Sequence, residues 1–120
     1  MKTLGIGIDI INNKRIRALI NNKSFIDRTY GKSEIKLSKK ITNKTNYFAK
    51  RFAAKESLAK SLGTGFRNNL NFKDIEILND KKGKPYYFKT KKIDNIINKK
   101  FKVKNYNLFL SISDEKNYSI

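Results

Sequence analysis

Residues 46–65 contain the feature that most limits what this chain can fold into, a long run of helix-forming residues closed by glycine. At about 100° per residue, Phe48, Phe52 and Ala59 fall on one narrow stripe of a helix. Gly63 suits the left-handed conformation that commonly ends a helix, because glycine has no Cβ. The pattern predicts one helix from about residue 46 to residue 62, buried along the aromatic stripe.

A neighbouring stripe of the same helix carries a carboxylate and an ammonium one turn apart, beside two residues too small to cover them. Its members are Ala49, Ala53, Glu56 and Lys60. The small side chains leave room for a ligand. Glu56 and Lys60 also have the spacing and order of an ordinary surface ion pair, worth only about a few tenths of a kcal/mol, and the helix alone does not separate the two interpretations.

The N-terminal residues alternate in the manner of a strand. Over residues 4–11, large apolar side chains occupy one face, and Gly5, Gly7 and Asp9 occupy the other. A carboxylate in such a run is costly unless it is hydrogen-bonded, paired or bound to a cation. The glycines would let a ligand approach the backbone, which favours a site at Asp9, and a helix-capping aspartate is the alternative.

Helical patterns occur on both sides of the long helix. Asn12 or Asn13 can cap a helix over about residues 14–21. Short helices and turns are predicted over residues 22–45, with a helix start near Glu34, and a short basic helix over residues 91–100.

Strand patterns dominate the second half of the chain. They cover residues 72–78, 85–89, 106–113 and 118–120, with turn residues over 79–83. We therefore expect one α+β domain over residues 1–120, in which the first strand and the last three share a small antiparallel sheet packed on the long central helix.

The composition of the chain suggests a polyanionic partner, which could be nucleic acid, membrane phosphate, an acidic protein or a nucleotide. Twenty-eight basic residues against 10 acidic ones give a formal charge of +18, although the abundance of lysine, asparagine and isoleucine is also what an AT-rich coding sequence produces. There is no cysteine and no histidine, which excludes thiolate chemistry and the commonest general base. We expect a cytoplasmic protein without a membrane segment, whose modest apolar content favours an oligomer.

Two segments of the chain resemble a known enzyme family. The run Phe52-Ala-Ala-Lys-Glu56 with Lys60 and Gly63-Thr-Gly65, and the run Gly7-Ile-Asp-Ile10, resemble the signatures of the holo-acyl-carrier-protein synthases, the small class of 4'-phosphopantetheinyl transferases. The resemblance extends in the same order over nearly the whole chain. It implies that the protein transfers the 4'-phosphopantetheine arm of coenzyme A to a serine of apo acyl carrier protein, and so activates the carrier for fatty acid biosynthesis.

The resemblance also implies roles for individual residues. Asp9 and Glu56 would hold Mg²⁺, Lys60 would neutralise or protonate the leaving phosphate, and either Glu56 or a water held by the metal would accept the serine proton. Coenzyme A would further contact a set of residues made up of Arg51, Lys60, Gly63, Gly65, Lys84 and Pro85.

The carrier and the assembly follow from the same resemblance. Acyl carrier proteins are acidic, and the positions that match the docking surface of the family are Arg15, Lys23 and Arg28. A solvated basic helix face is the alternative interpretation of these residues. The family assembles as homotrimers with each active site between two subunits, so a trimeric phosphopantetheinyl transferase fold is expected here.

One position departs from the family pattern. Family members often have Ser-His-Thr where this chain has Ser113-Asp114-Glu115. A carboxylate next to phosphate is repulsive unless it is protonated or shares a cation. Asp114 could instead contact the water shell of the metal, Lys60 or a ribose hydroxyl, and the sequence leaves its role open.

Two functions of other classes compete with the transferase. A nucleic-acid binding protein would explain the charge of +18, but not the carboxylates at Asp9 and Glu56, and no zinc-finger, aromatic-platform or helix-turn-helix motif is present. A basic interaction domain without chemistry predicts that removing these two carboxylates changes little. We therefore expect coenzyme A and an acidic carrier as partners, rather than nucleic acid or membrane.

Overall fold

The long helix predicted from the sequence is the centre of the fold. The computed structural model describes residues 1–67 and 69–120, and in it α4 spans Lys44–Ser61. The side chain of Asn43 caps its start by accepting a hydrogen bond from the Asn46 N–H. Gly63 follows its last turn with φ +77°, as the predicted glycine stop requires.

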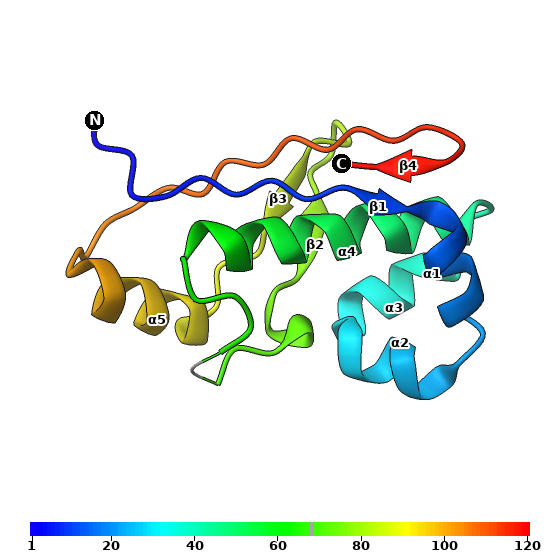
Figure 1. Cartoon of the computed structure of the whole chain (residues 1–120), viewed down its shortest axis with the longest axis horizontal. Helices are drawn as coiled ribbons and strands as arrows, with labels where there is room; N and C mark the ends of the chain where they lie inside the picture. The colour runs from blue at the N-terminus through cyan, green and yellow to red at the C-terminus, as the bar shows by residue number, and fades with distance from the viewer. Residues whose placement is uncertain (68) are drawn as a thin grey trace.

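Two hydrophobic clusters divide the length of α4 between them (Figure 1). The first half of the helix, including Phe48 and Phe52, packs against the helices that precede it in the chain. The second half, including Leu58 and Ala59, packs against β2, β3 and α5. The predicted aromatic stripe is therefore buried, and each half of the helix packs against its own cluster.

The N-terminal helices are short and depend on this packing. They are α1 (Asn13–Leu19), α2 (Lys23–Thr29) and α3 (Lys32–Ser38). As predicted, the Asn12 side chain caps α1 by accepting from the Lys14 N–H. Helices of seven residues are too short to be stable alone in water, so contact with α4 holds them in place.

The strands form two separate small sheets instead of the single sheet that we predicted. β1 (Ile11–Asn12) pairs antiparallel with β4 (Tyr118–Ser119). β2 (Ile77–Asn79) pairs antiparallel with β3 (Pro85–Tyr87), which confirms the predicted hairpin. The α+β class with small antiparallel sheets on a long helix is confirmed.

Two helical elements complete the second half of the chain. Residues 72–74, which were predicted to begin a strand, form the 3-10 helix η1 (Phe72–Asp74), because the Asp74 carboxylate turns back to accept from the Asn71 N–H. The predicted basic helix is α5 (Lys91–Phe101). Its Thr90 cap accepts from the Ile93 N–H.

Residues 1–10 and 105–112 run along α4 without strand pairing (Figure 1). Of the strands predicted over 4–11 and 106–113, only the ends pair, Ile11 with Ser119 and Ser113 with Ile120. The isoleucine side of the first segment faces outward: Ile6, Ile8 and Ile10 are 84%, 71% and 59% exposed. Its glycine side faces α4. An exposed apolar face of this kind is suited to contact with another chain.

Candidate active site

The first site contact joins residues from the N-terminal segment and α4. The Lys60 ammonium donates to Asp9 Oδ1 at 2.9 Å and to the Ile8 carbonyl at 3.2 Å, although Asp9 lies 51 positions earlier in the chain. The hydrogen bond to Asp9 and the charge of that carboxylate raise the pKa of Lys60. Lys60 therefore remains a cation, and its side chain is 52% exposed, so it is accessible to a ligand.

Glu56 faces the same space from one turn earlier on α4. Partial burial raises the pKa of its carboxyl group, and the charge of Asp9 raises it further, while Lys60 and Arg15 oppose the shift. The repulsion from Asp9 means that the two carboxylates lie within electrostatic reach of each other. A cation placed between them would remove that repulsion.

This pair of carboxylates fits a magnesium ion. Mg²⁺ keeps several waters and usually binds one or two protein carboxylates together with substrate phosphates. Asp9 and Glu56 supply two such groups, and within the described ranges no cluster of three or more acidic or histidine ligands occurs. The other ligands of a metal bound here would therefore be water and substrate.

Gly5 and Gly7 allow Asp9 to approach the helix. A Cβ built on Gly7 would lie 1.8 Å from the Ser57 carbonyl oxygen, and one on Gly5 would lie 2.1 Å from that of Ser61. Only glycine fits so close to the α4 backbone. We predicted that these glycines admit a ligand; instead it is α4 that occupies the space beside them.

Arg51 belongs to a different face of α4. The residue is 5% exposed, and its guanidinium donates to Asn79 Oδ1 at 2.8 Å and lies 3.7 Å over the Tyr47 ring. Burial lowers the pKa of Arg51. Asn79 ends β2 and leads into the turn that carries Lys84 and Pro85, so these three predicted coenzyme A contacts lie on the hairpin side of the molecule.

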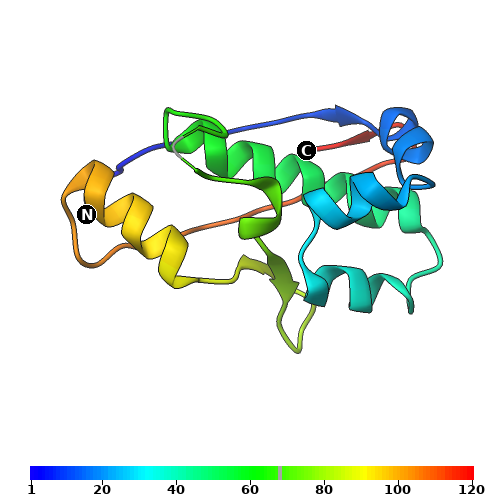
Figure 2. The same cartoon turned by 90° about the horizontal axis from the view of Figure 1, so that it is seen from below.

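The predicted site residues thus form separate groups within one chain. Figure 2 shows the N-terminal segment and the β2–β3 hairpin on opposite sides of α4. Gly63 and Gly65 lie just beyond the end of α4 with φ +77° and +62°, and a Cβ on Gly65 would have no neighbour within 4 Å.

The predicted docking residues lie on the first two helices. Arg15, on α1, is close enough to lower the pKa of Glu56. Lys23 begins α2, and Arg28, on the same helix, donates to Ser24 Oγ at 3.1 Å. The basic face therefore begins beside the carboxylate pair.

The whole chain also matches proteins of known family. A model of the 4'-phosphopantetheinyl transferase superfamily matches residues 5–118. The chain belongs to this superfamily. This confirms the family resemblance found in the sequence.

The transferase is similar to several holo-[acyl-carrier-protein] synthases. The protein of that name from Pelagibacter ubique is 58% identical over 120 residues, which cover 100% of this chain and 94% of the relative. The crystal structure of the synthase from Neisseria meningitidis superposes with a TM-score of 0.88 at 34% identity, covering 98% of this chain and 94% of the other. The synthase from Bacillus anthracis, in complex with CoA (3',5'-ADP), superposes with a TM-score of 0.79 at 33% identity and covers 97% and 90% of the two chains.

Asp114, where the transferase departs from the family pattern, faces the first half of α4. Its carboxylate accepts from Asn46 Nδ2 at 2.9 Å and lies 3.7 Å from Lys50 Nζ. Lys60, one of its predicted partners, instead pairs with Asp9. In this chain Asp114 joins the C-terminal hairpin of residues 113–120 to α4.

Sequence reasoning assigned no role to Lys55 and Glu34, which form a buried ion pair. Both side chains are 0% exposed, and Lys55 Nζ lies 2.6 Å from Glu34 Oε1. Lys55 follows Phe52 by three residues and precedes Ala59 by four, so it lies on the apolar stripe of α4. A lysine on such a stripe is the sequence signal that would have indicated a buried partner.

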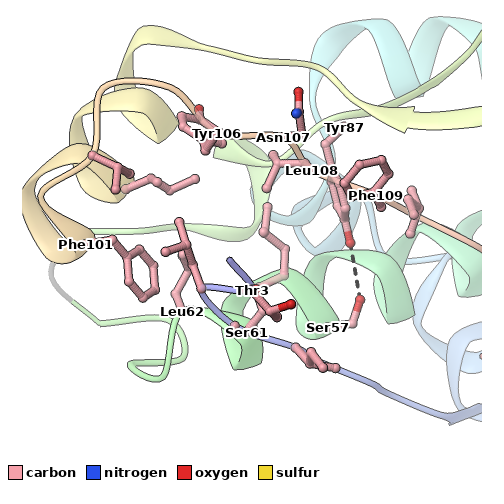
Figure 3. A pocket seen from close by; sticks show the side chains of 18 of the residues that line it. Thr3, Ser57, Ser61, Leu62, Tyr87, Phe101, Tyr106, Asn107, Leu108 and Phe109 are labelled. Carbon is pink, nitrogen blue, oxygen red and sulfur yellow. Dashed lines mark hydrogen bonds between the residues drawn. The ribbon is translucent and has the colours of Figure 1, made fainter. Parts of the chain in front are cut away.

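A cavity lies beside the carboxylates, and neither Asp9 nor Glu56 lines it. It has a volume of about 690 Å³ and is enclosed by the N-terminal segment, α4, α5 and residues 103–111 (Figure 3). Ser57 and Tyr87 form a hydrogen bond of 3.2 Å in its wall, and Tyr87 also donates to the Ala54 carbonyl. No acidic side chain is among the described residues that line it, so we assign the chemistry to the cluster at Asp9.

Among the described helices, none is long and apolar enough to cross a membrane.

Proposed function

We propose that the protein is a holo-[acyl-carrier-protein] synthase. It transfers 4'-phosphopantetheine from coenzyme A to a serine of an apo acyl carrier protein, releases adenosine 3',5'-bisphosphate, and so activates the carrier for fatty acid biosynthesis. The observation that carries the proposal is the cluster of Asp9, Glu56 and Lys60, formed from segments 51 positions apart. Relatives that cover 100% and 92% of the chain carry this activity in their names. The 120 residues act as one catalytic domain.

The residues of the cluster suit the two proton movements of the reaction. The serine oxygen attacks the phosphorus that carries pantetheine, and the bond from this phosphorus to the bridging oxygen of the pyrophosphate breaks. Either Glu56 or a water held by the metal would accept the serine proton. Lys60 remains protonated beside Asp9 and neutralises or protonates the leaving phosphate.

Asp9 and Glu56 are also the groups that would hold Mg²⁺. When bound, the ion would neutralise charge on the pyrophosphate and hold it in place. The ion would relieve the repulsion from Asp9, which adds to the effect of burial in raising the pKa of Glu56.

The carrier docks on α1 and α2 in this proposal. Arg15 lies close to Glu56, so an acidic carrier bound to Arg15, Lys23 and Arg28 would present its serine next to the carboxylate pair. The net charge of +18 favours rapid association with an acidic partner.

The complete enzyme is a homotrimer with composite sites. The β2–β3 hairpin and the N-terminal segment lie on opposite sides of α4 (Figure 2). Arg51 bonds to Asn79 of this hairpin, which also carries Lys84 and Pro85, so one chain does not surround coenzyme A with these residues and Asp9 together. In the assembly, one subunit supplies the cluster at Asp9 with Gly63 and Gly65, and its neighbour supplies the hairpin side. The outward-facing isoleucines of residues 6–10 give the apolar surface that such an assembly would cover.

Mixing two inactive variants tests the composite site. Glu56→Gln and Lys84→Glu would each disable every site of a trimer, but on different halves of the site. Trimers reassembled from both variants would regain activity at the sites that combine two intact halves. Mixtures that stay as inactive as either variant would refute the shared site.

The transfer itself is tested by mass spectrometry of the carrier. Incubation with Mg²⁺, coenzyme A and an apo acyl carrier protein should raise the mass of the carrier by one phosphopantetheine group, and a chelator should prevent this. If several acidic carriers keep their mass, the proposed activity is wrong.

A further inference from the structure

A buried ion pair that the proposed chemistry does not use lies directly behind the site. Lys55 precedes Glu56 in α4 and points in the inward direction, where its ammonium meets the Glu34 carboxylate from α3. Taking two charges out of water is expensive, and a pair of this kind is often no more stabilising than apolar side chains of similar volume. Its presence therefore calls for a role other than stability.

The hydrogen bonds of Lys55 join three elements, α4, α3 and η1, at one point. Its three ammonium protons go to Glu34 Oε1 at 2.6 Å, to the Phe72 carbonyl of η1 at 3.1 Å and to the Ile75 carbonyl just before β2. The donors of the ammonium are all used. The three hydrogen bonds therefore fix the direction in which the Lys55 side chain points, in addition to its burial.

Both oxygens of the partner carboxylate accept hydrogen bonds, and Oε2 also lies 3.9 Å from Arg51 Nε. Glu34 Oε1 accepts from the Gly31 N–H at 2.9 Å, and Oε2 accepts from the Ile77 N–H at 3.1 Å. The Glu34 carbonyl in turn accepts from the Tyr47 hydroxyl of α4 at 2.6 Å. Glu34 thus ties α3, β2 and α4 together through separate directional bonds.

Apolar packing alone does not fix the rotation of α4 about its own axis. Directional hydrogen bonds do fix it. The pair lies where the two hydrophobic clusters of α4 meet, between Phe52 and Leu58. Burial of apolar surface is not directional, so a small rotation of a helix changes the free energy of apolar burial only slightly. A side chain about 5 Å from the axis moves by about 1 Å when a helix turns by about 12°.

We propose that Glu34 and Lys55 are positioning residues, whose buried ion pair sets the rotation of α4 at which Glu56 and Lys60 meet Asp9. Consecutive residues of a helix project about 100° apart, so fixing Lys55 fixes the direction of Glu56. The inference rests on the proposed function for its catalytic readout. A displacement of about 1 Å at a reacting group can lower turnover by about 100-fold.

Glu34→Asp is the test variant, because it keeps the charge and shortens the side chain by one methylene group. The matched control is Ile97→Val, which removes one methyl group from a buried position of α5 in the same core. Both variants lower the unfolding midpoint. Turnover is measured well below both midpoints, where each protein is fully folded.

Three measurements separate positioning from stability. We expect Glu34→Asp to lower kcat by about 10- to 100-fold, to leave KM for the apo carrier unchanged, and to weaken Mn²⁺ binding to the substrate-free protein, measured by electron paramagnetic resonance. The control should change none of the three by more than about twofold. If Glu34→Asp keeps both kcat and Mn²⁺ affinity within about twofold of wild type, the inference is wrong.

A second variant covers the case in which Glu34→Asp does not fold. The double change Glu34→Gln and Lys55→Met removes the charges of Lys55 and Glu34 together, and Arg51, whose Nε lies 3.9 Å from Glu34 Oε2, keeps its hydrogen bond to Asn79. It should show the same loss of kcat and of Mn²⁺ affinity, and retention of both would overturn the proposal. If the wild-type protein modifies no carrier, the proposed function fails, and the Mn²⁺ comparison alone decides the positioning role.

Discussion

Gly7→Ala tests how the N-terminal segment carries Asp9 to the site. The added Cβ would lie 1.8 Å from the Ser57 carbonyl oxygen and 2.8 Å from the Ser61 nitrogen, both of them backbone atoms of α4. Neither atom can move without bending the helix. Gly7 is not among the glycines with positive φ, so the cost of the substitution comes from the clash and not from backbone strain.

The size of the displacement follows from the contact distance. Ordinary contact begins at 3.4 Å, so the segment must retreat from α4 by about 1.6 Å at Gly7. Asp9 is two residues further along, and the 2.9 Å hydrogen bond from Lys60 to its carboxylate would be lost. An exposed ion pair of this kind contributes only about 0 to 1 kcal/mol of stability, whereas a misplacement of about 1 Å at a catalytic group can cost about 100-fold in rate.

The assay is the rate of carrier modification, followed by mass spectrometry, together with the thermal unfolding midpoint. We expect about a 100-fold loss of kcat with a small drop in midpoint. Gly83→Ala is the control, because it adds the same methyl group at φ +86° with no neighbour within 4 Å. It should cost about 1 kcal/mol of stability through strain and leave kcat unchanged. A Gly7→Ala protein with wild-type turnover and midpoint would refute the close packing of the segment on α4.

Three further predictions concern single groups. Glu56→Gln should abolish carrier modification without lowering the unfolding midpoint, because it removes a charge that burial already disfavours; a variant with full turnover would exclude Glu56 from the chemistry. Arg15→Glu should raise KM for the carrier much more than KM for coenzyme A in steady-state kinetics, and equal increases would contradict docking at this residue. Burial raises the pKa of Tyr87 to about 12, so the folded state resists ionisation, and the free energy of unfolding should fall as pH rises from about 10 to 12 by roughly 2 to 3 kcal/mol. Tyr87→Phe should lack this part of the decline in chemical denaturation, and an identical decline in both proteins would show that Tyr87 does not cause it.

The local elements were largely predictable from the sequence. The apolar stripe and Gly63 gave the extent of α4 to within two residues, and Asn12 was correctly expected as a cap of α1. These signals are short-ranged, because capping and helical periodicity involve residues within one or two turns of each other. The unpaired residues 1–10 and the division into two sheets were not predicted, since strand pairing depends on segments far apart in the chain.

The site was predictable as a list of residues but not as an arrangement. The family signature named Asp9, Glu56 and Lys60, yet nothing in the sequence stated that Lys60 would hold Asp9 or that Arg51 would turn to the opposite side of the helix. Lys55 was overlooked although it lies on the apolar stripe, because its partner Glu34 is 21 positions away.

The sequence by itself determined the helix that carries the carboxylate and the lysine, its glycine stop, and the family to which the chain belongs. Only the tertiary structure decided which groups meet. Two glycines pressed on the backbone of α4 bring Asp9 to Lys60, and a buried ion pair holds the helix from behind. The physical reason is that periodicity sets the direction of a side chain relative to its own helix, whereas contacts between distant segments set the direction in which that helix faces.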